Sequence, residues 1–222
     1  MDVSQLFDNL YQEQDRYWWR DKDRFATNPD AYPFSLMTQM MLRVLGDCPA
    51  GRALDLGAGE GTDSIRLVKL GYEVDAVEIS TVAVNKIRRF AAEEEAKVDV
   101  AVADIRAYEL TGQYDVIICN GVLHYIEDKQ QVVQRMQEAT RPGGINAVSL
   151  WSTYSPVPDC HKTVPVFCDD ENGIVTRLYS KWQTDFLYFE HCKPETSHSG
   201  SPEHCHSHIK LIARKPMPDS VP

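Results

Sequence analysis

Short apolar runs alternate with amphipathic stretches along most of this chain. The predicted strands, each rich in Val, Ile, Leu or Ala, fall at residues 52–56, 72–78, 98–104, 114–120 and 143–150. The predicted helices between them fall at 62–70, 81–96 and 130–139. Because parallel strands need a crossover helix to connect them, this alternation predicts a doubly wound α/β fold with a mostly parallel sheet.

The two ends of the chain contain further predicted elements. Apolar residues recur near helical spacing over 3–24 and again over 35–45, so both segments are expected to be helices. Two more β-rich stretches lie at 186–191 and 208–214. The proline-bearing segment 151–177 has no regular pattern and is too long for a neutral connector, which makes it the expected substrate-binding insert.

A glycine-spaced loop follows the first predicted strand. Gly57, Gly59 and Gly61 would let the backbone turn sharply and approach a ligand without interference from Cβ atoms. Seventeen residues beyond Gly61, Glu78 ends the next apolar run, where a carboxylate can meet ribose hydroxyls. The pairing predicts a nucleoside-binding site.

Asp55 indicates which kind of nucleoside this site prefers. It lies two residues before Gly57, at the end of the strand, where its charge would repel a pyrophosphate. S-adenosylmethionine has a sulfonium and an ammonium group but no phosphate, so it suits an acidic loop. A nicotinamide-dependent dehydrogenase is the alternative, and an ordinary strand–turn–helix without a ligand is another.

Other polar side chains are expected at the same edge of the sheet, because the carboxyl ends of parallel strands meet there. Asp104 follows the third strand and is expected either to accept a hydrogen bond from the adenine amine or to cap the next turn. Ile79 and Ile105 are expected to pack against the ring. The predicted cofactor-binding residues are Asp55, Gly57, Ala58, Gly59, Gly61, Glu78, Ile79, Asp104, Ile105, Asn120 and Gly121.

These motifs together resemble the class I S-adenosylmethionine-dependent methyltransferases. The similar stretches are LDLGAGEGT at 54–62, VDAVEIS at 74–80, VADI at 102–105, YDVIICNGVLHYI at 114–126 and RPGG at 141–144. Within that superfamily the chain is most similar to the TehB group, over roughly residues 40–215. The resemblance implies a seven-stranded sheet closed by an antiparallel C-terminal hairpin. It also implies that Tyr11, Tyr17, Trp18 and Trp19 cover the cofactor and substrate, whereas plain packing on the sheet is the alternative.

The composition of the chain limits its domain organisation, its partners and the state of its cysteines. The chain has 222 residues, of which 43% are hydrophobic and 25% charged, so we expect one domain: 1–34 as a lid, 35–150 as the cofactor-binding core, and 151–222 as insert and hairpin. A net charge of −10 without a basic stripe disfavours nucleic acid as a partner. With no leader-like or membrane-spanning segment, a cytoplasmic monomer or homodimer acting on a small molecule is expected. The six cysteines show no paired spacing and are expected to be reduced.

Methyl transfer depends chiefly on alignment and exclusion of water, and a base is needed only if the acceptor carries a proton. His124, just after the fourth strand, is the first candidate base, with packing or helix capping as the alternative. Asp159 and His161, on either side of Cys160 in the insert, form a second candidate pair, in which the carboxylate orients the imidazole. A solvated loop is the alternative there.

Histidines are concentrated near the C-terminal hairpin. On a strand, His204, His206 and His208 would share one face, but their spacing matches no structural zinc pattern, so no metal site is expected. Glu195 and His198 could instead reach with His206 toward the substrate pocket. Tyr154, Trp151 and Arg177 are weaker candidates for contacts with the substrate.

The function expected from the sequence is transfer of a methyl group from S-adenosylmethionine to an O, N or S atom of a small metabolite. One alternative is a methyltransferase for a chalcogen oxyanion such as tellurite or selenite. Another is a partner subunit that binds the cofactor without catalysing transfer.

Overall fold

The structure is a computed structural model that describes residues 2–16, 25–30, 35–46, 48–195 and 203–218. The expectations for Tyr17, Trp18, Trp19 and His198 lie outside these residues. The side chains of Cys160 and Glu195 also lie outside the described part.

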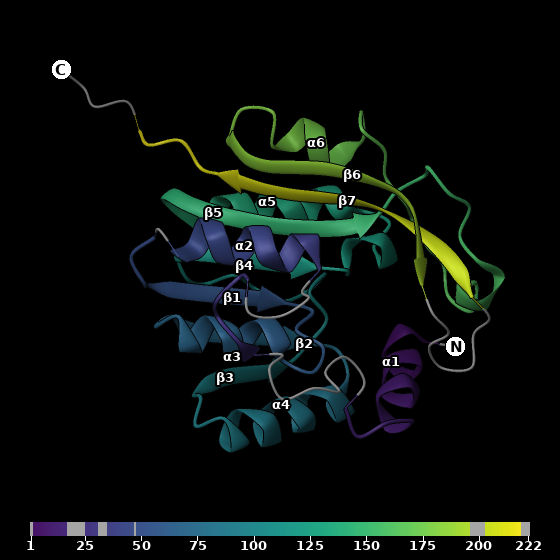
Figure 1. Cartoon of the computed structure of the whole chain (residues 1–222), viewed down its shortest axis with the longest axis horizontal. Coiled ribbons are helices and arrows are strands. Elements are labelled where there is room, and N and C mark those ends of the chain that lie inside the picture. The colour runs from purple at the N-terminus through teal and green to yellow at the C-terminus, as the bar shows by residue number, and fades with distance from the viewer. Residues whose placement is uncertain (1, 17–24, 31–34, 47, 196–202, 219–222) are drawn as a thin grey trace.

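Seven strands form one sheet in the described residues (Figure 1). They are β1 (Arg52–Leu56), β2 (Glu73–Glu78), β3 (Val98–Val102), β4 (Tyr114–Asn120), β5 (Thr140–Trp151), β6 (Gln183–Glu195) and β7 (His204–Arg214). Their order is β3-β2-β1-β4-β5-β7-β6, with β1 to β5 parallel to one another. Strand β7 lies antiparallel to both β5 and β6. This arrangement confirms the expected fold class, including the closing hairpin.

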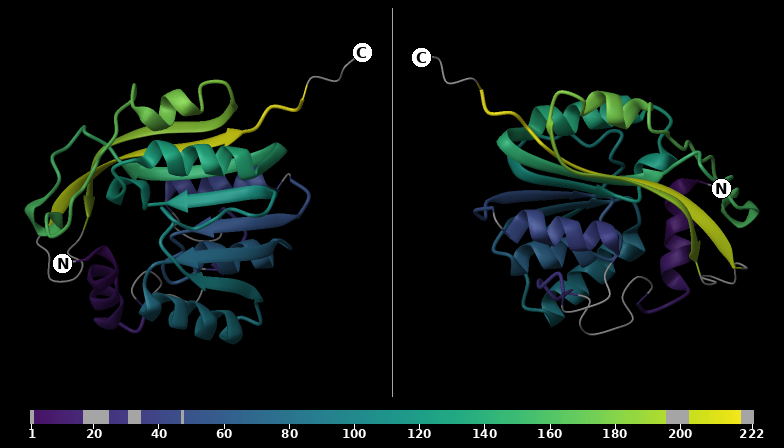
Figure 2. Two further views of the ribbon diagram at one scale, coloured as in Figure 1. Left: turned by 180° about the vertical axis from the view of Figure 1, so that it is seen from behind. Right: turned by 45° about the horizontal axis from the view of Figure 1, so that its top comes forward.

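Helices cover both faces of the sheet. They are α1 (Val3–Gln12), α2 (Leu36–Gly46), α3 (Thr62–Lys69), α4 (Thr81–Glu93), α5 (Lys129–Ala139) and α6 (Ile174–Leu178), with short 3-10 helices η2 (Leu123–Tyr125) and η3 (Asp159–His161). Apolar residues of α2 and α3 pack on one face and those of α5 and α6 on the other. Figure 2 shows α5 and α6 on the side of the sheet opposite to α2.

The central strands β1 and β4 are largely apolar because both of their faces are buried. In β4, Val116 and Ile118 point into the cluster beneath α2, whereas Ile117 and Cys119 point into the cluster beneath α5. This alternation follows from the two-residue period of a strand. It explains why the sequence shows continuous apolar runs rather than an alternating pattern.

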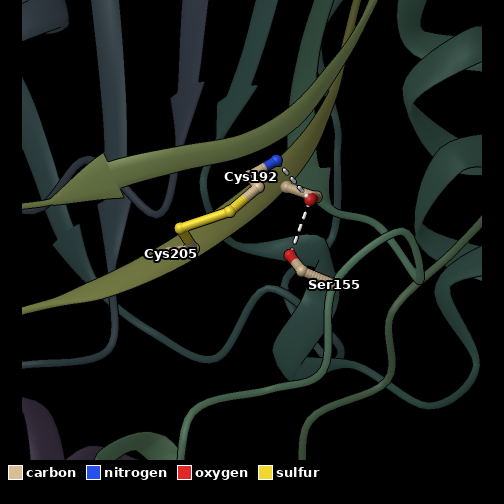
Figure 3. Close-up of a disulfide and its surroundings, with 4 residues drawn as sticks. Ser155, Cys192 and Cys205 are labelled. Atoms are coloured by element: carbon tan, nitrogen blue, oxygen red, sulfur yellow. Dashed lines mark hydrogen bonds between the residues drawn. A yellow bond between two sulfur atoms is a disulfide. The ribbon is translucent and has the colours of Figure 1, made fainter.

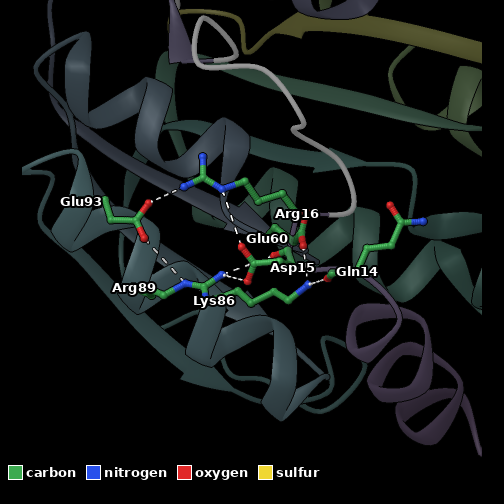
Figure 4. A network of polar contacts seen from close by, with 7 residues as sticks. All are labelled: Gln14, Asp15, Arg16, Glu60, Lys86, Arg89 and Glu93. Atoms are coloured by element: carbon green, nitrogen blue, oxygen red, sulfur yellow. Dashed lines mark hydrogen bonds and ion pairs between the residues drawn. The ribbon is translucent and has the colours of Figure 1, made fainter.

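Helix α1 is shorter than the helix expected over 3–24, because it ends at Gln12 and residues 13–16 are not helical. The backbone carbonyl of Gln14 accepts a hydrogen bond of 2.5 Å from Lys86, and Asp15 pairs with Arg89 at 2.6 Å (Figure 4). These contacts hold the non-helical segment 13–16 against α4. The prediction of a continuous helix was therefore wrong over 13–16.

A disulfide joins Cys192 of β6 to Cys205 of β7 (Figure 3). The expectation of reduced cysteines was wrong for this pair, while Cys48, Cys119 and Cys168 have free thiols. The register between β6 and β7 shifts between Glu190 and Lys193, and their Cα atoms at Cys192 and Cys205 are 4.9 Å apart. Such a shift cannot be read from cysteine spacing along the chain.

The segment 151–177 also contains more regular structure than expected, namely η3 and the start of α6. Helix α6 begins where the carboxylate of Asp169 accepts hydrogen bonds from the backbone N–H groups of Ile174, at 3.0 Å, and Val175, at 2.9 Å. A carboxylate that satisfies free N–H groups stabilises the first turn of a helix. Among the described helices, none has both the length and the apolar composition needed to cross a membrane.

Candidate functional site

A cavity of about 740 Å³ opens at the carboxyl edge of the parallel strands. One end is lined by the glycine loop and the ends of β2 and β4, and the other by the insert and the hairpin. Helix α1 contributes Val3, Leu6, Phe7, Leu10 and Tyr11 to its wall. The N-terminal helix therefore borders the cavity, and Tyr11, which is buried, also packs against Ala83 of α4.

The glycine loop needs its glycines for steric reasons. Gly57, Gly59 and Gly61 have φ values of 74°, 57° and 80°, in the left-handed region that side chains disfavour. A Cβ atom at Gly57 would lie 2.3 Å from Cγ2 of Val122. The backbone of the loop thus packs directly on the segment that follows β4. Ala58 also lines the cavity.

Glu78 is fixed at the end of β2 by two backbone N–H groups. Its Oε2 atom accepts from Gly59 at 2.9 Å, and its Oε1 atom accepts from Ser80 at 2.9 Å. Burial raises the pKa of Glu78, although these hydrogen bonds oppose the shift by stabilising the carboxylate. The carboxylate is held in one orientation where the cavity begins.

Asp55 is buried at the end of β1, and its Oδ2 atom accepts a hydrogen bond of 2.6 Å from the hydroxyl of Ser64. Burial, together with the negative charge of Asp63, raises the pKa of Asp55 to about 7. The carboxylate lies at the end of the cavity that the glycine loop lines. A cation bound nearby would favour its ionised form.

Asp104 and the two isoleucines lie in the cavity wall as expected. The carboxylate of Asp104 pairs with the guanidinium of Arg106 at 2.5 Å and accepts a hydrogen bond of 2.8 Å from the Arg106 backbone. Burial alone would raise the pKa of Asp104, but the hydrogen bonds and charge of Arg106 lower it. Asp104 therefore caps the following turn, and the predicted adenine contact stays a prediction. Ile79 and Ile105 flank the same end.

Asn120 and Gly121 follow β4 and also line the cavity. The amide of Asn120 donates to Oδ2 of Asp63 at 3.1 Å and accepts a hydrogen bond from the Ser149 hydroxyl. The sequence analysis missed Asp63 and Ser149. The signals were present, since Asp63 lies in the first turn after the glycine loop and Ser149 near the end of the fifth strand.

His124 lies in η2, buried beneath the insert. Burial, with the nearby rings of His208, His206 and His161, holds the pKa of His124 well below its usual range. Its Nδ1 atom accepts a hydrogen bond of 3.4 Å from the backbone N–H of Trp151, which places the ring proton on Nε2. The neutral ring can thus donate a hydrogen bond, whereas Nδ1, its proton-accepting atom, faces the backbone.

Trp151 lies between two imidazole rings. His124 stacks on it with ring centroids 4.2 Å apart, and His206 stacks on it at 4.2 Å. Tyr125 contacts Trp151 at 6.0 Å and Phe7 of α1 at 5.3 Å. These rings form an aromatic wall that reaches from α1 to the hairpin.

The structure brings His161 to the cavity but not Asp159. His161 is a lining residue, and its ring contacts Trp151 at 5.2 Å. The side chain of Asp159 is 94% exposed and pairs with Lys162 at 2.6 Å. The carboxylate is therefore turned to solvent, because its neighbour in sequence offers a cation there.

Several weaker candidates lie away from the cavity lining. Tyr154 bonds to Glu171, and Arg177 donates to the backbone carbonyl of Asn172. Among the candidates from the hairpin, His206 and His208 do line the cavity, as expected for side chains on one face of β7.

The glycine-loop end of the cavity is acidic. Its carboxylates belong to Asp55, Glu60, Asp63, Glu78 and Asp104. The arginines of this lining, Arg66 and Arg106, are each paired with one of these carboxylates, and Glu60 pairs with Lys86 at 2.7 Å. The field in this half of the cavity favours a cationic ligand and opposes a polyphosphate.

Known proteins resemble this chain in sequence and fold. A family model described as a methyltransferase domain matches residues 54–146. Hemagglutinin 1 of Eikenella corrodens is 31% identical over 60% of this chain and 44% of that protein. The ubiquinone biosynthesis O-methyltransferase of Bordetella avium is 26% identical over 57% of this chain and 53% of that protein. The chain thus spans about half the length of these curated relatives.

A solved structure extends the likeness to the fold. TehB from Haemophilus influenzae superposes with a TM-score of 0.68 at 20% identity, covering 79% of this chain and 61% of that one. At this identity the match concerns the fold alone. The structural match to TehB covers more of this chain than the family model does, which matches residues 54–146.

Proposed function

We propose that this protein, in which residues 54–146 match a methyltransferase domain and the strands follow the order β3-β2-β1-β4-β5-β7-β6, transfers a methyl group from S-adenosylmethionine to a small molecule. The observation that supports this most strongly is the position of Glu78. Its carboxylate is locked by Gly59 and Ser80 at the mouth of the cavity, where an acidic side chain can bind ribose hydroxyls.

The residues present fit this cofactor. The left-handed backbone at Gly57 and Gly59 lets the chain pass close to a ligand, and the space a Cβ atom would need at Gly57 is filled by Val122. The acidic lining suits a sulfonium and an ammonium group. We assign ribose binding to Glu78, adenine contacts to Ile79, Asp104 and Ile105, and the walls of the site to the remaining predicted residues.

When bound, S-adenosylmethionine supplies an electrophilic methyl group. The protein's part is to align the acceptor and exclude water, which can supply much of the rate acceleration. Phe7, Tyr125 and Trp151 provide an apolar wall for this purpose. His124, neutral and protonated on Nε2, positions Trp151 and donates a hydrogen bond to the acceptor.

The acceptor we favour is a small organic metabolite that is methylated on O, N or S. The aromatic wall supports a flat or apolar molecule, because stacking on rings needs such a surface. The similarity to a ubiquinone biosynthesis O-methyltransferase supports oxygen as the acceptor atom.

The resemblance of the sequence motifs to the TehB group leaves a chalcogen oxyanion as the second candidate acceptor. A subunit that binds the cofactor without turnover is a third reading. Screens with organic acceptors and with tellurite and selenite separate the three candidates. Methylation of an organic acceptor supports the first, methylation of tellurite or selenite supports the second, and methylation of none of them supports the third.

The first test is the binding of S-adenosylmethionine, S-adenosylhomocysteine and NAD to the purified protein, measured by calorimetry and by thermal melting. A ligand that binds only the native state raises the melting temperature by mass action. We expect both methionine-derived ligands to bind and NAD to leave the melting curve unchanged. Stabilisation by NAD alone would refute the proposal and indicate a dehydrogenase.

A further inference from the structure

Three imidazole nitrogens converge at the hairpin end of the cavity. Nε2 of His161 is 3.1 Å from Nε2 of His204, which in turn is 3.0 Å from Nε2 of His206. One ligand atom from each ring lies within 4.8 Å of those of the other two. His161 comes from η3 and the other two from alternate positions of β7, so elements distant in sequence build the cluster.

Two of these three separations are close to what one metal ion requires. Zinc binds histidine nitrogen at about 2.0–2.1 Å with tetrahedral angles, which places two ligand nitrogens roughly 3.3 Å apart. The observed distances of 3.0 and 3.1 Å need a slight opening to reach that value, and the third separation, which is within 4.8 Å, has to come to the same value. We propose that His161, His204 and His206 bind a divalent transition metal of the zinc type.

The surrounding structure holds the three rings in place. His206 is buried and stacks on Trp151, which also contacts the edge of His161. Cys205 lies between His204 and His206 in the sequence, and its disulfide joins β7 to β6 (Figure 3). Such support from neighbouring groups is what orients metal ligands in proteins.

A second link joins the insert that contains His161 to the strand that contains the other two rings. The hydroxyls of Ser155 and Ser207 are 2.6 Å apart, and the Ser207 hydroxyl also accepts from the backbone of Cys192 at 2.9 Å (Figure 3). The backbone N–H of Ser152 donates to the carbonyl of Ser207 at 2.8 Å. The ligands thus belong to one connected unit.

The place of the cluster suggests what the ion does, and this part rests on the proposed function. His161 and His206 line the same cavity as Gly59 and Glu78. Three protein ligands leave a fourth position open, as in catalytic zinc sites. We assign that position to the acceptor, which makes the acceptor a molecule with an ionisable hydroxyl or thiol.

The ion would lower the pKa of the hydroxyl or thiol, so that its proton leaves to solvent. The oxygen or sulfur then forms a bond to the methyl carbon. The bond from that carbon to the sulfonium breaks, and its electron pair stays on the sulfur of the departing S-adenosylhomocysteine. The ion thus supplies the activation that His124, with Nδ1 against the backbone, is poorly placed to give.

Metal binding can be tested apart from catalysis. Tag-free, full-length protein with its disulfide intact is stripped with a chelator and titrated with Zn²⁺ by calorimetry and with Co²⁺ by visible absorption. We expect one equivalent of each, with the absorption typical of tetrahedral cobalt. His161→Ala and His204→Ala should each weaken Zn²⁺ binding at least about 100-fold, because losing even an outer-sphere partner costs 10- to 100-fold.

The matched control is His191→Ala. His191 is exposed on β6 and its ring contacts that of Tyr154, outside the cluster. This variant should bind Zn²⁺ as the unmodified protein does. Absence of stoichiometric binding, or equal binding before and after His161→Ala, would overturn the site.

The role of the ion is tested by methyl transfer to thiol and hydroxyl acceptors before and after chelation, while calorimetry follows the cofactor. Lost transfer with unchanged S-adenosylmethionine affinity, restored by Zn²⁺, supports the role. Full transfer by metal-free protein overturns it and leaves the metal site standing. Failure to bind S-adenosylmethionine at all would refute the proposed function instead, without affecting the Zn²⁺ titration.

Discussion

The carboxylate of Glu78 accepts a hydrogen bond of 2.9 Å from the backbone N–H of Gly59, so the end of β2 fixes the middle of the glycine loop. Two features that the sequence placed nineteen positions apart are one structural unit. A change at either residue therefore alters both the shape of the loop and the charge presented to a ligand.

Glu78→Gln should weaken S-adenosylmethionine binding by about 10- to 100-fold, because hydrogen bonds to a charged group are worth roughly 1.5–3 kcal/mol. The amide keeps one acceptor for the backbone, which limits the loss of stability. Calorimetry gives the dissociation constant, and Glu73→Gln, at the exposed start of β2, is the control. Unchanged affinity in a folded Glu78 variant would show that the ribose contact is misplaced.

Gly57→Ala should lower stability more than Gly121→Ala, although both glycines have φ of 74°. The strain of the left-handed backbone, about 1–2 kcal/mol, is common to both variants. Only at Gly57 does the new Cβ meet Val122, while nothing lies within 4 Å at Gly121. Urea unfolding measures the difference. Adding Val122→Ala should recover part of it, and equal losses at the two glycines would contradict the packing argument.

Asp55 should make stability depend on pH. Its pKa is about 7 in the folded protein and 3.8 as a free side chain, so the unfolded chain releases this proton first. The contribution of Asp55 is fully present below about pH 4 and is lost as the pH rises to about 7, at up to ~1.4 kcal/mol per pH unit. Asp55→Asn should therefore gain stability over the unmodified protein as the pH rises through this range.

Urea titrations at pH 4 to 8 test this, with Asp99→Asn on the exposed face of β3 as the control. A difference between Asp55→Asn and the unmodified protein that stays constant with pH would show that burial does not shift this group.

The parts of the site that were predicted from the sequence are those whose residues are close together along the chain. The glycine loop and Glu78 were predicted because each belongs to one strand and its adjoining turn. The disulfide of Cys192 and the approach of His161 to β7 were not, since both depend on the β6–β7 register and on how the insert folds back. Asp159 is exposed because its carboxylate pairs with Lys162. The sequence pattern alone could not show that Asp159 pairs with Lys162 rather than with His161.

The buried pair of Lys86 and Glu60 should matter more to stability than the exposed pair of Arg16 and Glu93 in the same network (Figure 4). Lys86→Ala removes the cation that lies 2.7 Å from the buried Glu60 carboxylate, at a cost of about 3–5 kcal/mol. Arg16→Ala should cost about 1 kcal/mol or less, because solvent screens that pair. Urea denaturation compares the two, and Lys86→Met with Glu60→Gln should restore much of the loss. Equal effects would contradict the burial of the pair.

His124→Ala should slow methyl transfer by about 10- to 100-fold, as misplacement of neighbouring groups can. The affinity for S-adenosylmethionine should stay nearly constant. His124→Gln still donates an N–H but cannot take up a proton at neutral pH, so it should retain most of the turnover. Steady-state kinetics with an identified acceptor decide this. Equal losses in the two variants would instead make His124 the general base that the sequence suggested.

Trp151, with His124 on one face and His206 on the other, makes the protein its own optical reporter. Indole fluorescence changes when the charge or contact of an adjoining imidazole changes. An ion held by His206 and a ligand that displaces the ring of His124 would act on the same fluorophore from opposite sides. With the other three tryptophans of the chain replaced by phenylalanine, the emission of Trp151 would show in a single titration whether the two ends of the cavity respond together or in sequence.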